Sequence, residues 1–243
     1  QAGDIFAKQL PQADVEVVHH LQTNLIGYDR SWNPLVYQMF GGSLGTSLDY
    51  PNLYRREVGR QPEDFVPRWR QGHDEAIAGG IHVGLIAVLN HATLATGAEA
   101  FYRFFVDELG IKDFQVNTPF FAHNQDASLK PLDAAELGQF LSDLADVWLA
   151  EGLERGVKLG PFDELLNWFA GREGTLPCMW RPNCPHDLVS IDPDGNVAQC
   201  DCWVSSYPEH HFGNLFRDAP LGELLARSTA RRAIISRPLQ LVT

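Results

Sequence analysis

The sequence predicts an α/β protein followed by a smaller unit of different character. Strand-like and helix-like segments alternate from Val15 to Thr118, which is typical of a parallel sheet covered by helices. After Gly174 the chain changes to short strands, turns and prolines. All four cysteines of this 243-residue chain lie in that last part, between Cys178 and Cys202. We therefore expect a sheet-and-helix domain first and a cysteine-bearing domain after it.

Four strands are expected in the first part, and each ends in a polar or turn cluster. They cover Val15–Thr23, Gly45–Leu48, His82–Asn90 and Phe114–Thr118, with helices expected at Ser31–Phe40, Pro62–Ala78 and Thr96–Leu109. The polar strand ends are Gln22-Thr23-Asn24, Ser47 with Asp49, Asn90 with His91, and Asn117. Ligands of parallel α/β folds bind at the carboxyl ends of the strands, so these clusters predict one shared site.

The chain divides into three expected segments. We expect the sheet-and-helix domain over 1–128, a helical linker region over 129–174 and a cysteine-bearing domain over 175–243. The linker region has amphipathic helices at Ala134–Glu151 and Phe162–Ala170. In the last segment, Asp194-Gly195 predicts the turn of a β-hairpin, and Leu221–Arg232 predicts a final helix.

Composition excludes several classes of function. The formal net charge is −12, so a protein that tracks nucleic-acid phosphates is not expected. No lysine or arginine run favours an anionic membrane surface, and no apolar run is long enough to cross a bilayer. The opening residues lack a basic segment followed by an apolar one, so we expect a cytoplasmic protein. In a reducing compartment, metal binding suits the clustered cysteines better than disulfides do.

Cys178, Cys184 and Cys200 are the candidate metal ligands. The hairpin between Cys184 and Cys200 would bring distant thiolates together, as an iron–sulfur cluster requires. From spacing alone, a structural zinc site and plain burial of small hydrophobic thiols remain open. Asp192-Pro193-Asp194-Gly195 is not a calcium loop, because the later bidentate glutamate is missing.

Two further motifs have a structural and a functional interpretation. Adjacent Arg55 and Arg56 are typical of a solvated loop, although a guanidinium there could also clamp a carboxylate at the sheet mouth. The stretch from Gly41 to Gly45 matches the Gly-x-Ser-x-Gly pattern of serine hydrolases. It follows a helix rather than a strand, so a plain helix-to-strand turn is expected.

Taken in order, these motifs resemble the radical SAM enzymes that carry a SPASM domain, the peptide and protein maturases, and in particular the sulfatase-maturating branch. Gln22-Thr23-Asn24 resembles the family's QTN strand end, and Ser47-Leu48-Asp49 with Tyr54-Arg55-Arg56 resembles its S-[IL]-D…yR stretch. Cys184-x10-Gly195-x4-Cys200 resembles the opening of the SPASM cysteine pattern, and Gly213-Asn214 resembles its GN before a helix.

The resemblance implies a fold, a reaction and site residues. The fold would be a partial (β/α)6 barrel, its last four strands, followed by a partial SPASM domain. Gln22, Asn24, Ser47 and Arg55 would bind S-adenosylmethionine, with Arg55 on its carboxylate. Cys178, Cys184 and Cys200 would hold an auxiliary 4Fe–4S cluster, and Asp201 would be the catalytic base. The parent enzyme would cleave S-adenosylmethionine to a 5′-deoxyadenosyl radical and modify a peptide or protein side chain.

The chain also departs from the family's pattern. Leu25 and Tyr50 stand where the family usually has glycine, and no CxxxCxxC motif or Gly-Gly-Glu strand occurs. The later SPASM cysteines do not appear either, so we expect a fragment that is inactive alone, with a fourth cluster ligand beyond Thr243. The alternative is a non-catalytic peptide-binding protein or partner subunit with a structural metal or zinc site.

Overall fold

The computed structural model of the protein describes residues 17–120, 131–172, 176, 186 and 188–236. The chain divides into two compact units, one formed by Gln1–Thr118 with Leu132–Asp163 and the other by Pro119–Pro131 with Glu164–Thr243. Of the expected linker region, Leu132–Asp163 groups with the first unit.

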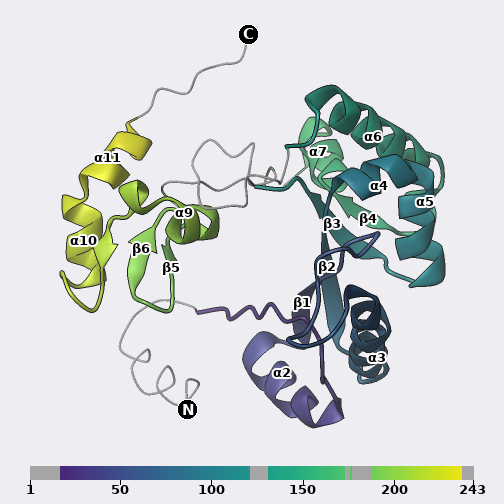
Figure 1. Ribbon diagram of the computed structural model, residues 1–243, viewed down its shortest axis with the longest axis horizontal. Coiled ribbons are helices and arrows are strands. Elements are labelled where there is room, and N and C mark those ends of the chain that lie inside the picture. The colour runs from purple at the N-terminus through teal and green to yellow at the C-terminus, as the bar shows by residue number, and fades with distance from the viewer. Residues whose placement is uncertain (1–16, 121–130, 173–175, 177–185, 187, 237–243) are drawn as a thin grey trace. The chain divides into compact units, whose positions relative to one another are not determined.

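The first unit is built on a four-stranded parallel sheet of order β1-β2-β3-β4 (Figure 1). The strands are β1 (Ser43–Ser47), β2 (His82–Val88), β3 (Asp113–Asn117) and β4 (Lys158–Gly160). Each pair of neighbours is parallel, with Thr46 opposite Leu85, Leu85 opposite Phe114 and Phe114 opposite Leu159. Buried residues alternate along the first three strands, as expected for a sheet with two distinct faces.

The predicted four-stranded parallel sheet is confirmed, but one of its strands is not the predicted one. In the described part of Val15–Thr23, only Gln22 bridges to the sheet, opposite Gly45. The fourth strand is instead β4, on the far edge beside β3. At three residues it is too short to show the two-residue periodicity that identifies strands in a sequence.

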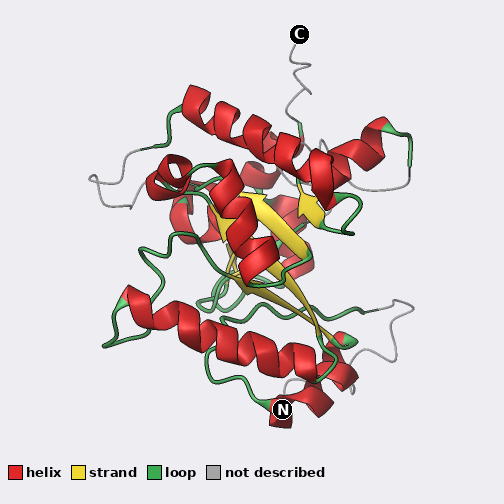
Figure 2. Cartoon of the chain, turned by 90° about the vertical axis from the view of Figure 1, so that its right-hand side faces the viewer, coloured by secondary structure: helices red, strands yellow, loops and turns green. Residues whose placement is uncertain are grey.

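Helices cover this sheet, and Figure 2 shows the yellow strands bracketed by red helices. They are α2 (Asn33–Phe40), α3 (Phe65–Ala78), α4 (His91–Thr96), α5 (Ala98–Arg103) and α6 (Ala134–Val147). A further helix, α7 (Phe162–Phe169), begins in the first unit and lies mostly in the second. Short 3₁₀ turns precede α2 and α3 at Arg30–Trp32 and Pro62–Asp64, and π-helical turns follow α5 and α6 at Phe104–Glu108 and Trp148–Gly152. The expected helix Thr96–Leu109 is interrupted at Gly97, whose φ of 91° no helix can contain.

Aromatic side chains fill the core between the sheet and its helices. Phe105 stacks on Phe114 with ring centroids 5.4 Å apart, and Phe101 packs against Phe105 at 4.8 Å. Two buried tryptophans also have their indole N–H groups satisfied: Trp69 donates to Thr46 Oγ1 (2.9 Å) and Trp148 to the carbonyl of Val157 (2.8 Å). These bonds fix α3 and the end of α6 to the sheet, since a buried donor without a partner is costly.

The second unit contains a small antiparallel sheet of order β5-β6-β7. Its elements are β5 (Ser190–Ile191), β6 (Asn196–Ala198), α9 (Asp201–Ser206), a 3₁₀ turn (Pro208–His210), β7 (Gly213–Asn214), α10 (Leu221–Arg227) and α11 (Thr229–Ile235). The predicted hairpin is confirmed. The predicted helix Leu221–Arg232 is broken at Ser228, whose backbone is extended and whose hydroxyl accepts from the N–H of Arg231.

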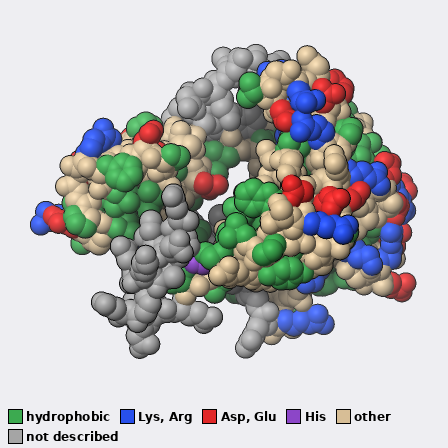
Figure 3. All heavy atoms as spheres, turned by 90° about the horizontal axis from the view of Figure 1, so that it is seen from below, with side chains coloured by type: hydrophobic (Ala, Val, Ile, Leu, Met, Phe, Trp, Pro, Cys, Tyr) green, Lys and Arg blue, Asp and Glu red, His purple; other side chains and the backbone are tan. Residues whose placement is uncertain are grey.

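Two surface properties of the described chain bear on function. Its helices include none that combines the length and apolar character needed to cross a membrane. On the face shown in Figure 3, basic and acidic side chains are interspersed rather than gathered into a field of one sign. Ion pairs such as Arg155–Asp107 (2.6 Å) are consistent with this mixed pattern.

Candidate functional site

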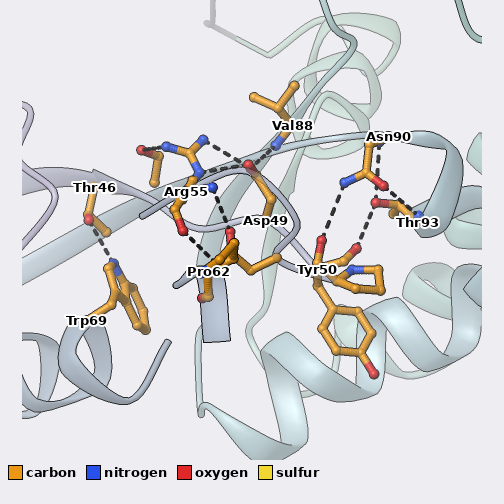
Figure 4. A network of polar contacts seen from close by, with 12 residues as sticks. Thr46, Asp49, Tyr50, Arg55, Pro62, Trp69, Val88, Asn90 and Thr93 are labelled. Carbon is orange, nitrogen blue, oxygen red and sulfur yellow. Dashed lines mark hydrogen bonds and ion pairs between the residues drawn. The ribbon is translucent and has the colours of Figure 1, made fainter. Parts of the chain in front are cut away.

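Arg55 is the centre of a polar network at the carboxyl end of β1 (Figure 4). Its guanidinium forms a two-pronged pair with Asp49, through Nε to Oδ2 (2.7 Å) and Nη2 to Oδ1 (3.0 Å). The remaining terminal nitrogen, Nη1, donates to the hydroxyl of Ser47 at 2.7 Å. Asp49 is buried and Arg55 is partly exposed. The geometry is therefore a charge-assisted fork that holds the guanidinium at the mouth of the sheet.

Backbone contacts fix both members of this pair. Asp49 Oδ1 also accepts from the backbone N–H of Val88, at the end of β2 (3.0 Å). The side chain of Asn52 closes the loop that carries Arg55: its amide donates to the carbonyls of Arg55 (2.9 Å) and Pro62 (2.8 Å), and its oxygen accepts from the Arg55 N–H. The Arg55 side chain is thus positioned by two strand ends and one closed loop.

The end of β2 joins the same region through Asn90 and Thr93. Asn90 caps α4, accepting from the N–H of Thr93 at 3.0 Å, and its amide lies 3.4 Å from the carbonyl of Pro51. The Thr93 hydroxyl donates to the carbonyl of Tyr50 at 2.7 Å. The polar ends predicted for the second and third expected strands therefore meet, as parallel strand ends should. Asn117 takes part through its backbone carbonyl, which accepts a hydrogen bond from the N–H of Leu89.

Gln22 lies beside β1, opposite Gly45, which is two residues before Ser47 in that strand. The backbone around it pairs with Gly45, through Thr23 N–H to the Gly45 carbonyl (2.9 Å) and Gly45 N–H to the Leu21 carbonyl (2.8 Å). The Gln22 amide covers Gly45, and any Cβ at that position would overlap it. Gly45 and Ser47 lie on one face of the strand, so Gln22 and Ser47 border the same surface.

Asn24 and Leu25 form a tight turn after Gln22. Asn24 Oδ1 accepts from the Ile26 N–H at 3.0 Å, which directs the amide to its own backbone. Leu25 has a φ of 56°, a conformation that favours glycine, yet its side chain is buried. The departure from the family's glycine at this position is thus accommodated by packing, against Gly72 of α3.

The cysteine region is described in part. Cys178 and Cys184 lie outside the described residues, whereas Cys200 directly precedes α9 and Asp201 is the first residue of that helix. Cys202 follows in the same turn, and the ligand atoms of Cys200, Asp201 and Cys202 all lie within 4.8 Å of one another. Asp201 is exposed and both cysteines are partly buried. The candidate base and one candidate ligand therefore lie together, in company with a thiol that the sequence interpretation did not use.

The hairpin before Cys200 is held by Asp192 and Asn214. Asp192 Oδ1 accepts from the N–H groups of Asp194 (2.9 Å) and Asn196 (2.8 Å). Bonds from the side chain of Asn196, then from these backbone groups, lower the pKa of Asp192. The buried Asn214 amide donates to the carbonyl of Asp194 and to Asn196 Oδ1, both at 2.9 Å. These contacts confirm a structural turn at Asp194-Gly195 and give the Gly213-Asn214 motif a structural role.

Comparison with known proteins identifies the fold. No protein-family model and no curated protein matches the sequence. Among solved structures, anSMEcpe with bound AdoMet matches with a TM-score of 0.73 and 21% identity, over 96% of this chain and 60% of that chain. The same protein with bound AdoMet and the Kp18Cys peptide gives 0.69 and 20%, over 96% and 63%. SuiB of Streptococcus suis, bound to S-adenosylmethionine, gives 0.57 and 14%, over 88% and 49%.

These neighbours are radical SAM/SPASM enzymes, and anSMEcpe is an anaerobic sulfatase-maturating enzyme. The chain has their fold, which is the fold that the ordered motifs implied. The chain spans 60% of the length of the first of them.

Two residues of the site were missed by sequence reasoning. Asp49 was noted only as a strand end, although it is the principal partner of Arg55. Cys202 was left without a role, although its ligand atom lies within 4.8 Å of that of Cys200.

Proposed function

We propose that the chain is the S-adenosylmethionine- and peptide-handling part of a radical SAM/SPASM maturase. The whole protein would cleave S-adenosylmethionine reductively and act as an oxidoreductase on a peptide or protein side chain. The observation that carries the proposal is the Ser47–Asp49–Arg55 network at the carboxyl end of β1. Supporting it, the solved structures of the same fold contain AdoMet, and two of them contain peptides.

Arg55 is suited to a ligand carboxylate. A guanidinium has five N–H donors. The contacts to Asp49 and Ser47 use three of them, so two remain for a ligand. These two lie on the terminal nitrogens of a side chain that is partly exposed. Because Asp49 already fixes the fork, little rotamer entropy is lost when a carboxylate binds.

Ser47, Gln22 and Asn24 would complete the binding surface. The Ser47 hydroxyl and the Gln22 amide border one face of β1 and offer polar atoms to a ribose or an amino-acid group. Asn24 would act differently, since its oxygen holds the turn that follows Gln22. We assign Asn24 to positioning Gln22 and the other three residues to contact with S-adenosylmethionine.

Cys178, Cys184 and Cys200 would hold the auxiliary 4Fe–4S cluster. Thiolates are the ligands that such a cluster takes, and Cys200, the member of this set that the structure describes, is a partly buried thiol at the end of the hairpin. When bound, such a cluster supplies an electron acceptor. The exposed side chain of Asp201 would accept a proton from a substrate carbon as that carbon is oxidised.

Binding of S-adenosylmethionine to the full chain tests the proposal. Isothermal titration would compare S-adenosylmethionine with 5′-methylthioadenosine, which lacks the amino-acid group. Arg55→Gln should weaken S-adenosylmethionine about 10- to 100-fold, the loss expected for charge-assisted hydrogen bonds, and leave methylthioadenosine unchanged. Arg56→Gln is the matched control, because Arg56 is the exposed neighbour, and it should change neither affinity.

Two results would contradict the proposal. One is equal affinity of the unaltered chain for both ligands, which would show that the chain does not recognise the carboxylate of S-adenosylmethionine. The other is an equal effect of Arg55→Gln and Arg56→Gln, which would reduce Arg55 to general surface charge.

A further inference from the structure

We propose that Cys202 is a metal ligand that binds the same soft metal centre as Cys200, with the carboxylate of Asp201 beside them. The metal is one that prefers thiolates. The inference rests on the proposed function only where the metal is the iron of an auxiliary cluster. As a two-thiolate site it stands on the geometry of this segment alone.

The three donor atoms are close enough to share a metal. The Sγ atoms of Cys200 and Cys202 and a carboxylate oxygen of Asp201 all lie within 4.8 Å of one another. A zinc–sulfur bond is about 2.3 Å, so two sulfurs on one tetrahedral ion are about 3.8 Å apart. Small side-chain rotations would bring donors at the observed spacing onto one centre.

The backbone explains why residues so near in sequence converge. Cys200 is extended (φ −151°, ψ 173°) and is the last residue before α9. Its carbonyl accepts from the N–H groups of Trp203 (3.1 Å) and Val204 (2.9 Å), which turns the chain at once into the helix. Cys202 is therefore brought back toward Cys200 rather than continuing away from it.

The surroundings hold this turn in place. The side chains of Val197 and Ala198, immediately before it, are buried, and so is that of Val204 after it. The His211 ring nitrogen Nε2 lies 2.8 Å from the carbonyl of Val204 and ties α9 to the following segment. A chelate on a fixed turn loses little conformational entropy when a metal binds.

Charge also favours a cation here. Between His186 and Phe216 the sequence has five acidic residues and no lysine or arginine; the acids are Asp187, Asp192, Asp194, Asp201 and Glu209. A metal cation bound at the two thiols would be attracted by this local excess of acidic residues.

The experiment uses the full chain, purified without oxygen in a phosphine reductant, in two arms. The first titrates Co²⁺ and follows the thiolate-to-metal charge-transfer absorbance, whose intensity reports the number of bound sulfurs. The second reconstitutes with iron and sulfide and measures both per chain, with electron paramagnetic resonance of the reduced sample. The variants are Cys202→Ser and Cys200→Ser, and Ser206→Ala on the same helix is the control.

We expect Cys202→Ser to lower Co²⁺ affinity at least about tenfold and to reduce the charge-transfer intensity, as Cys200→Ser does, whereas Ser206→Ala changes neither. In the iron arm, Cys202→Ser should lower iron content or alter the resonance spectrum. Unchanged Co²⁺ affinity and intensity in Cys202→Ser, with a loss in Cys200→Ser, would overturn the proposal. Iron that fails to load while Co²⁺ binds through both cysteines would overturn the iron–sulfur part of the proposed function and leave Cys202 a ligand.

Discussion

Gly72 of α3 is a position where one added methyl group should disturb the backbone of the turn that follows Gln22. A Cβ built there would lie 3.0 Å from the carbonyl carbon of Leu25 and nearer still to its oxygen. Real Cβ atoms essentially never come closer than 3.0 Å to another heavy atom, so the Leu25 backbone must move. Leu25 has little freedom to move, because it is buried and has a positive φ.

The magnitude follows from two opposing effects of Gly72→Ala. Replacing glycine by alanine within a helix favours folding by about 1 kcal/mol. Overpacking a tight contact costs about 1–3 kcal/mol, and the upper half applies here because backbone rather than a flexible side-chain end must shift. We therefore expect a net loss of about 1–2 kcal/mol, and a Tm lower by about 2–8 °C.

Gly138→Ala is the matched control. Gly138 is also inside a helix, α6, but a Cβ there meets nothing within 4 Å. It should gain the same helix propensity, so the difference between the two variants isolates the contact with Leu25. Thermal and urea unfolding of the full chain would measure both. A Gly72→Ala protein as stable as Gly138→Ala would refute the close approach of α3 to Leu25.

Three further perturbations test the network and the core. Asp49→Asn removes the carboxylate that holds Arg55 and should cost about 2 kcal/mol in urea unfolding, less than for a fully buried pair because Arg55 is partly exposed; an effect below about 0.5 kcal/mol would show that the pair is loose. Trp69→Phe leaves the fully buried Thr46 hydroxyl without its donor and should cost about 1–3 kcal/mol, part of which Thr46→Val should restore. Burial lowers the pKa of His73, and a hydrogen bond with Asp74 offsets this only in part. The imidazole of His73 therefore binds a proton more tightly in the unfolded chain than in the folded protein. The contribution of the neutral, buried His73 to folding stability is present above about pH 6.5 and is lost as the pH falls below that value. Unfolding at pH 7.5 and 5.5 should show a smaller pH dependence in His73→Gln, and an equal slope would contradict the burial effect.

The sequence by itself determined the class of fold and which strand ends carry the residues of the candidate site. The two-residue and helical periods of the first part predicted three strands correctly, because each has a buried face long enough to show alternation. Asp194-Gly195 predicted the hairpin for a local reason: Gly195 has a φ of 83°, which glycine adopts at no steric cost. Helix breaks at Gly97 and Ser228 were missed, because the apolar pattern continues across both.

Only the tertiary structure decided which residues act together. Lys158–Gly160 is a strand because β3 offers it an open edge, and no property of three residues could announce that. Asp49 became the partner of Arg55 because a closed loop and the N–H of Val88 bring a strand end and a later residue to one point. Cys202 joined Cys200 because the chain turns from strand to helix between them. Periodicity and motifs are local properties, whereas contact between distant side chains depends on packing.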